Sequence, residues 1–388
     1  MKKPPFIAGL PVTGELFVDR EEEIKKLIAL IKARQPTAIS SPRKIGKTSL
    51  IKEVENRLKN IIPIYIDCWE LTSQKELAEN IIKNTIKAYS LATGKKEVIT
   101  KVKLFFSQKI RQMLDAIESI DGEIKNILTI YVEFKDRTVN IKELLTAAFD
   151  FPDRFAREKK IKFVLIFDEF QNLKEFDGEL LKLMRARIQQ HKAVSYVISG
   201  SQQSVLEYLL IHPSSPFYKM FEFIKLEMLH EQEVKAFIKK RFKKFGFQIG
   251  SQQVMHICYL TACHPFYFQK LCLKIYNMMS IRRLKAIDEK VIKDAYESMI
   301  EDLWPTFEDT WSVSLSKAPL QKEVLKLLAF YDFSSAKQIS DTEPFITVQS
   351  ANLALRELVT KGFLIKKARG EYEFIDKIFK DFIKRRFG

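Results

Sequence analysis

The stretch Thr37–Ile51, TAISSPRKIGKTSLI, decides the fold. A short apolar strand, a tight loop and a helix opened by Gly46-Lys47-Thr48 follow one another in it. In such a loop the backbone N–H groups and the helix N-terminus face an anion, the lysine adds charge near the β- and γ-phosphates, and the threonine hydroxyl reaches Mg²⁺. We therefore predict a phosphate-binding loop, whose candidate residues are Ser41, Pro42, Arg43, Lys44, Ile45, Gly46, Lys47, Thr48 and Ser49.

The loop departs from the usual motif at its first position. Ser41 stands where glycine is usual, with four residues between it and Gly46. The alternative is a chance Gly-Lys-Thr turn in a lysine-rich chain. A strand before the loop and a helix after it argue against that alternative.

A second informative stretch, Lys162–Gln171, reads KFVLIFDEFQ. Its apolar run predicts a strand buried on both faces, with two carboxylates at the end where ligands bind in open α/β sheets. Beside a phosphate-binding loop, Asp168 is placed to hold Mg²⁺ through water and Glu169 to orient and deprotonate an attacking water. Taken alone, the pair could be an ordinary strand end.

Three further strands are expected at 61–67, 193–201 and 221–226. The order strand, loop, helix, strand is a βαβ unit, which favours a parallel sheet. The predicted fold class is α/β, a P-loop NTPase with five parallel strands. Ser199 or Ser201, at the end of the fourth strand, is where a γ-phosphate sensor would lie; a plain strand-to-loop turn is the alternative.

The region around 90–135 reads as an insertion to which we assign no role. Helical spacing of apolar residues runs through 77–89, 102–120 and 141–155, whereas Ile127–Phe134 has strand-like composition.

From Glu231 the pattern is helical. One helix carries lysines and arginines opposite an apolar stripe, which fits either a solvated face or an anion-binding face. Pro265 fits the first turn of another helix and puts His264 at its N-terminus. We expect an ATPase domain over 1–229, a helical lid over 230–316 with a junction at Asp302–Ser316, and a third domain over 317–388.

The last segment has the layout of a winged helix: three helices, two strand-like runs and a basic closing helix. Winged helices bind DNA or dock proteins, and both remain open here. The residues that its second-helix surface would offer to a groove are Thr347, Gln349, Ser350, Asn352 and Arg356.

A formal net charge of +16 and a pI near 9.4 favour an acidic partner: nucleic acid, nucleotide or anionic membrane. A lysine- and glutamate-rich surface adapted to heat would give a similar composition. The four cysteines lack zinc-site spacing and indicate a reducing compartment. Without a signal-peptide run or 18 consecutive apolar residues, we expect a cytoplasmic protein that spans no membrane.

The order of these motifs resembles the archaeal Walker-type ATPases, in the STAND division of P-loop NTPases with an AAA+-like core. The matching stretches are Phe17–Glu21, Ser41–Ser49, Phe167–Gln171, Ser199–Ser201, Cys263–Pro265 and the C-terminal winged helix. The resemblance implies ATP and Mg²⁺ as ligands, a lid after the sheet, and hydrolysis as a conformational switch. It also implies nucleotide contacts from Val18, Arg20, His264 and Pro265, and catalytic roles for Lys47, Asp168, Glu169 and Ser199.

Two kinds of departure from the family pattern predict slow or partner-gated hydrolysis. Asp19, Ser41 and Cys263 replace glycines near the nucleotide. Lys219-Met220 stands where the family often has Gly-Arg, so an arginine that could assist cleavage is missing there. Arg185 or Arg187 is a candidate substitute.

Three functions remain open at this stage. The first is an ATP-hydrolysing switch whose winged helix meets DNA or a partner protein. The second is a DNA-binding, initiator-type protein in which nucleotide is mainly structural. The third is a nucleotide-bound scaffold without turnover.

Overall fold

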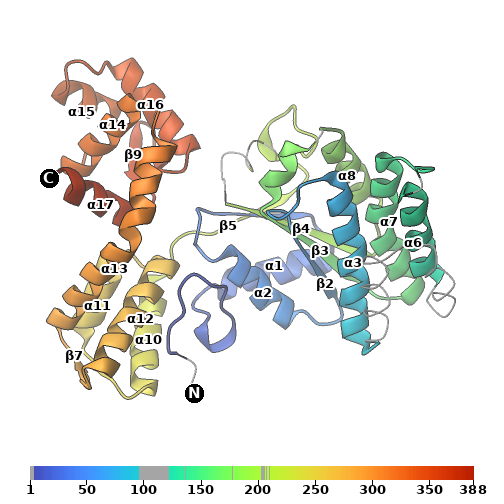
Figure 1. The fold of residues 1–388 in the computed structure, drawn as a ribbon, viewed down its shortest axis with the longest axis horizontal. Coiled ribbons are helices and arrows are strands. Elements are labelled where there is room, and N and C mark those ends of the chain that lie inside the picture. Colours follow the sequence, from blue (N-terminus) through green and yellow to red (C-terminus); the bar gives the residue numbers. More distant parts are fainter. Residues whose placement is uncertain are drawn as a thin grey trace.

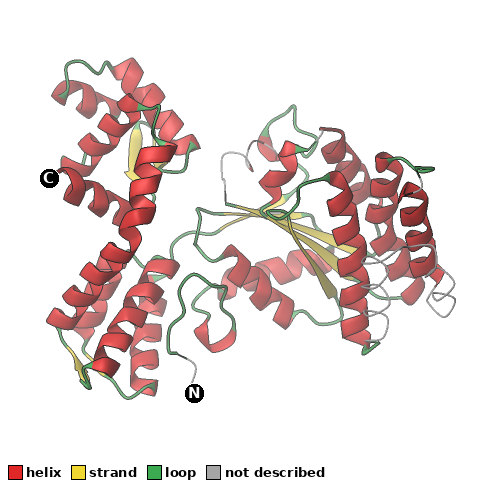
Figure 2. Cartoon of the chain, viewed as in Figure 1, coloured by secondary structure: helices red, strands yellow, loops and turns green. Residues whose placement is uncertain are grey.

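The computed structural model describes residues 4–95, 122–135, 137–176, 178–201, 206, 208 and 210–388. In this part of the chain a parallel sheet is followed by a second half that is almost entirely helical, standing beside the sheet (Figure 2). No helix among the described residues is both long and apolar enough to cross a bilayer. The predicted helix at 102–120 lies outside the described residues.

Five parallel strands form the sheet, in the spatial order β2-β3-β4-β1-β5. This confirms the predicted α/β class and all five predicted strands. Parallel pairing places the carboxyl ends of all strands at one edge, where β1 leads into the loop and β3 ends in Asp168. The strands are β1 (Thr37–Ser40), β2 (Ile62–Asp67), β3 (Phe163–Asp168), β4 (Val194–Gly200) and β5 (Glu222–Lys225).

Helices cover both faces of the sheet (Figure 1). Alternate side chains of β3 pack in two hydrophobic cores, one on each face of the sheet. Phe163, Leu165 and Phe167 lie in one core, and Val164 and Ile166 lie in the other. Because both faces are buried, the strand needs a continuous apolar run. One face is covered by α1 (Glu21–Ala33) and α2 (Lys47–Arg57), the other by α3 (Gln74–Thr93), α6 (Gly122–Lys135), α7 (Ile141–Lys159) and α8 (Gly178–Gln190).

The strand-like prediction for Ile127–Phe134 is wrong, because these residues lie inside α6. The buried side chains of α6 recur at helical spacing, and this helix packs against α7. They are Ile124, Ile127, Leu128, Tyr131 and Val132. β-Branched and aromatic composition suggested a strand, but the three-and-four spacing decides the structure.

The second half shares one core that extends to the end of the chain. Within the predicted junction Asp302–Ser316, residues 302–309 continue α13 through Pro305. The helices of this half are α10 (Glu231–Lys244), α11 (Ser251–Thr261), α12 (Pro265–Ile281), α13 (Glu289–Asp309), α14 (Pro319–Phe330), α15 (Ala336–Thr342), α16 (Val348–Thr360) and α17 (Lys377–Phe387). Two short strand pairs accompany them: β6 (Gln248–Ile249) pairs with β7 (Ala286–Ile287), and β8 (Leu364–Ala368) pairs with β9 (Glu371–Phe374).

An N-terminal segment, residues 4–18, fastens the helical half to the sheet. Phe6 is fully buried in the helical core and packs on Phe242, with ring centroids 4.8 Å apart. Arg241 Nε donates to the Pro5 carbonyl at 2.8 Å. Farther along, the Val12 N–H donates to Ser49 Oγ of α2 at 3.1 Å. One short segment therefore ties α10 to the helix that follows the phosphate-binding loop.

We predict that Phe6→Ala destabilises the protein by roughly 3 to 5 kcal/mol, because the substitution leaves a cavity in a closed core. The measurement is the urea unfolding midpoint. Phe345→Ala is the matched control, since Phe345 is 93% exposed, and it should leave the midpoint within error. Equal effects of the two substitutions would contradict the fastening role of this segment.

Candidate active site

The turn between β1 and α2 has the backbone of a phosphate-binding loop. Gly46, with φ +98°, precedes the first residue of α2, a conformation that glycine adopts without strain. Lys47 is buried, and its Nζ donates to Ser41 Oγ at 3.3 Å and to the Pro42 carbonyl at 3.4 Å. Burial lowers the pKa of Lys47, while the carboxylates of Glu169 and Asp168 act in the opposite direction. The ammonium is thus held inside the loop, facing two acidic groups.

Asp168, the last residue of β3, accepts hydrogen bonds from three different elements. Oδ2 accepts from Thr48 Oγ1 at 2.8 Å and from the Tyr65 hydroxyl at 2.7 Å, and Oδ1 accepts from Ser199 Oγ. Burial and then the Asp168 carboxylate raise the pKa of Tyr65, so the phenol remains a donor. The carboxylate joins α2, β2, β3 and β4 at the carboxyl edge of the sheet.

The carboxylate of Glu169 accepts hydrogen bonds from two neighbouring side chains. Its Oε2 accepts from Gln171 Nε2 at 2.5 Å and from Ser201 Oγ at 2.6 Å. The backbone of Glu169 is left-handed, with φ +51°, which a non-glycine residue adopts at a cost of about 1 kcal/mol. Gly200 makes room for this network, since a Cβ there would lie 2.5 Å from Gln171 Oε1.

The donor set suits Mg²⁺. The Thr48 hydroxyl and an Asp168 carboxylate oxygen lie 2.8 Å apart, and hard oxygen ligands of this kind are what Mg²⁺ takes from proteins that bind it together with phosphates. One carboxylate and one hydroxyl leave the remaining positions for phosphate oxygens and water.

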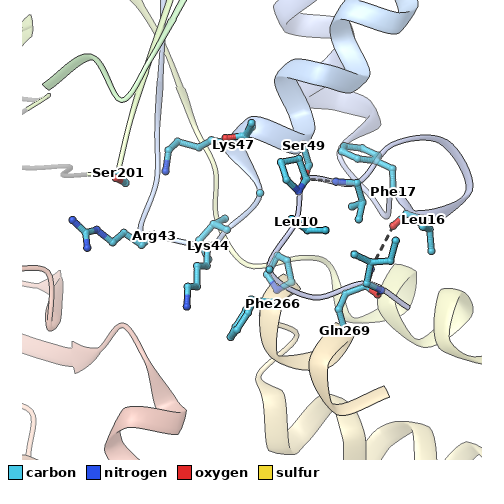
Figure 3. A pocket seen from close by; sticks show the side chains of 18 of the residues that line it. Leu10, Leu16, Phe17, Arg43, Lys44, Lys47, Ser49, Ser201, Phe266 and Gln269 are labelled. Atoms are coloured by element: carbon cyan, nitrogen blue, oxygen red, sulfur yellow. Dashed lines mark hydrogen bonds between the residues drawn. The ribbon is translucent and has the colours of Figure 1, made fainter. Parts of the chain in front are cut away.

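A cavity of about 560 Å³ opens beside these groups (Figure 3). Its polar wall comes from the phosphate-binding loop, Asp168, Glu169 and Ser201. Its apolar wall comes from the N-terminal segment and α12: Leu10, Val12, Leu16, Phe17, Val18, Phe266 and Phe268. A polar end beside an apolar end matches a nucleotide, whose phosphates and base differ in the same way.

An ATPase domain family found predominantly in Archaea matches residues 17–270. The chain belongs to this archaeal ATPase family. The match confirms the resemblance to archaeal Walker-type ATPases and spans the loop, both carboxylates and the first turn of α12.

Solved structures agree on the fold. The Walker-type ATPase PABY2304 of Pyrococcus abyssi is 18% identical, with a TM-score of 0.69 over 98% of this chain and 99% of that one. The ORC2 protein of Aeropyrum pernix, solved as ADPNP–ADP complexes, is 12% identical, with a TM-score of 0.56 over 99% and 96%. No curated protein matches the chain significantly.

The fold brings most of the predicted site residues to this cavity. The lining includes Val18, Arg20, Asp168, Glu169, Pro265 and the loop from Arg43 to Ser49. Ser41, Pro42 and Ser199 do not line it but act on groups that do, through Lys47 and Asp168. His264 does not line it either. Its buried imidazole accepts a hydrogen bond from the Phe266 N–H at the start of α12.

Sequence reasoning missed Tyr65 and most of the apolar wall, of which it named only Val18. The sequence holds one signal for the apolar wall, in residues 5–18 directly before a helix. The apolar residues there follow neither a helical nor a strand period, so they form no face of a local element. The contact between this segment and α12 joins residues 262 positions apart, through Ile7 N–H and Gln269 Oε1 at 3.3 Å. No local pattern indicates such a pairing.

The three residues that replace family glycines lie outside the cavity lining. Asp19 and Cys263 adopt left-handed backbone, with φ of 63° and 54°, where glycine would be unstrained. None of Asp19, Ser41 and Cys263 lines the cavity. Asp19 Oδ2 instead accepts from the His230 N–H at 2.8 Å and so fixes the approach to α10.

A cation of the phosphate-binding loop reaches the helical half of the protein. Lys44 Nζ lies 4.2 Å from the centre of the Phe266 ring. The next residue, Tyr267, donates its hydroxyl to Asp376, whose carboxylate caps α17. Beside them His264 is buried, and burial followed by the nearby charge of Lys44 lowers its pKa from 6.5 to about 3.

We predict that His264 makes stability depend on pH. Its folded pKa lies below its unfolded value, so the unfolded chain takes up a proton that the folded chain excludes. The neutral imidazole therefore contributes fully to the free energy of unfolding above pH 6.5, and this contribution is lost as the pH falls toward 3. From pH 7 to pH 5, the free energy of unfolding measured with urea should fall by about 2 kcal/mol more in the wild type than in His264→Asn. The asparagine keeps a neutral cap on the helix. Identical losses would contradict a buried neutral imidazole.

Proposed function

We propose that the protein binds ATP with Mg²⁺ and hydrolyses it as a slow conformational switch. The observation that carries the proposal is the Asp168–Thr48 hydrogen bond, which joins the carboxylate after β3 to the phosphate-binding loop. Glu169 stands next to it on the cavity wall. A binding site alone would not need a second carboxylate aimed at the phosphate end.

The proposed roles follow from this arrangement. Lys47 and the loop N–H groups would bind the β- and γ-phosphates, and Thr48 and Asp168 would hold Mg²⁺, which neutralises charge on the phosphates when bound. Glu169 would accept a proton from water as the water oxygen bonds to the γ-phosphorus. The bond from that phosphorus to the β–γ bridging oxygen breaks, releasing ADP and inorganic phosphate.

The apolar wall supports a purine ligand. Phe17, Val18 and Phe266 line the cavity away from the carboxylates and offer apolar surface to a base. ATP is the proposed nucleotide, because the family is an ATPase family. Slow turnover is supported by Lys219-Met220, where no arginine stands, and by the strained backbone of Glu169.

A switch needs a path from the nucleotide to another part of the protein. The contacts from Lys44 to Phe266, and from Tyr267 to Asp376, connect the loop with α12 and α17. We propose a STAND-type arrangement of an ATPase domain (1–229), a lid (230–316) and a winged helix (317–388). The lid and the winged helix share one core, which favours their moving together.

The winged helix is the proposed output, engaging DNA or a partner protein in the cytoplasm. Exposed Gln349 and Arg356 on α16 and exposed Lys366, Lys367 and Arg369 near the β8–β9 turn support contact with DNA. Exposed Leu353 on the same helix and Phe345 ahead of it support a protein partner. Retention of duplex DNA that weakens steeply with salt would distinguish the two.

We predict that Lys47→Ala removes ATP binding, because the buried ammonium is lost from the phosphate site. Glu169→Gln should keep ATP affinity within a factor of about three and lower the turnover number at least about 100-fold, because the proton acceptor is lost. Fluorescent-nucleotide titration and phosphate release measure the two quantities. Lys240→Ala, on the exposed face of α10, is the control and should change neither. Unchanged turnover in Glu169→Gln would sink the hydrolytic mechanism.

A further inference from the structure

We propose that Arg43 is the arginine that stabilises charge on the γ-phosphate during cleavage, supplied by the phosphate-binding loop of the same chain. The inference rests on the proposed ATP hydrolysis. It names a residue for the role of the arginine that the family often has at the place of Lys219-Met220, where this chain has none. Four side chains on the described cavity wall are cationic: Arg20, Arg43, Lys44 and Lys47. Their contacts separate them clearly.

Three of the four cations have other partners. Arg20 is buried, paired with Glu23 at 2.8 Å and hydrogen-bonded to the Glu227 carbonyl. Lys44 lies over the Phe266 ring. Lys47 is held inside the loop by Ser41 and Pro42.

Arg43 differs from these three. Within the described residues it has neither a hydrogen bond nor an ion pair, and its side chain is exposed at the cavity. Arginine is also better suited than lysine to a transferring phosphoryl group, because its planar guanidinium donates two parallel hydrogen bonds to neighbouring oxygens.

The position of Arg43 agrees with this role. Figure 3 shows Arg43 and Lys47 leaving the loop on the side where Ser201 lies, whereas Lys44 points elsewhere. Ser201 is hydrogen-bonded to Glu169, so this side of the loop is the side of the proposed proton acceptor. The charge of Arg43 also acts on Lys47, whose pKa it helps to lower. A guanidinium there adds positive charge where negative charge develops on the γ-phosphate oxygens.

The other arginines considered from the sequence lie elsewhere. Arg187 pairs with Asp150 at 3.2 Å, near the start of β4. Because β3 and β4 are parallel, this is the end of the sheet opposite Asp168. Arg185 is an exposed residue of α8 that does not line the cavity. Neither is placed to assist cleavage.

The test compares Arg43→Ala and Arg43→Lys with Arg185→Ala, an exposed arginine away from the cavity. For each full-length protein the dissociation constants of Mg·ADP and of Mg·ADP with aluminium fluoride are measured, together with the turnover number and KM. Aluminium fluoride mimics the planar phosphoryl group of the transition state. Its trapping with Mg·ADP therefore measures stabilisation of the transition state without requiring turnover.

We expect Arg43→Ala to keep ADP affinity within about threefold while trapping of the fluoroaluminate complex and turnover both fall by at least about tenfold. Arg43→Lys should recover part of the loss, and Arg185→Ala should match the wild type. Equal losses of ADP and fluoroaluminate affinity would overturn the proposal, since Arg43 would then be a ground-state contact. Unchanged trapping would overturn it as well.

The two proposals fail in different ways. A wild-type protein that binds ATP but releases no phosphate contradicts the proposed function. The ratio of fluoroaluminate to ADP affinity in Arg43→Ala still decides the role of Arg43 in that case, because the ratio does not depend on turnover.

Discussion

The hydrogen bond between Asp168 and Thr48 is the interaction on which the site depends. It connects two elements 120 positions apart in the chain, the end of β3 and the start of α2. Tyr65 from β2 and Ser199 from β4 donate to the same carboxylate. A buried carboxylate without such donors would be costly, so three hydroxyl groups both stabilise the charge and fix its direction. The same geometry leaves the threonine and carboxylate oxygens side by side, as a magnesium site requires.

The remaining structure encloses this cluster. The N-terminal segment crosses from the helical core to α2, and α12 brings Phe266 over the loop. The apolar wall is therefore formed by two segments outside the sheet, the N-terminal segment and α12. Since the helices after residue 230 share one core, a change at the loop that displaces α12 would displace the C-terminal helices with it. This shared core is the physical basis of the proposed switch.

The sequence predicted those features that depend on local pattern. A buried strand needs an apolar run, and a phosphate-binding loop needs glycine ahead of lysine, so β1, β3 and the polar wall were all predictable. The apolar wall depends on contacts such as Ile7 with Gln269, which no local pattern indicates. The composition of Ile127–Phe134 is typical of a strand, but the helical spacing of its buried side chains decides the structure. Tyr65 could not be recognised, because its hydroxyl acts on Asp168 only once β2 and β3 pair.

In the proposed mechanism, Asp168 and Thr48 together form a nucleotide-dependent metal site. Mn²⁺ in place of Mg²⁺ allows a direct test, in which electron paramagnetic resonance measures free and bound Mn²⁺ with and without ADP. We expect Mn²⁺ binding by the wild type to require ADP and to be at least about tenfold weaker in Asp168→Asn. Equal Mn²⁺ affinity in the wild type and Asp168→Asn, in the presence of ADP, would contradict it.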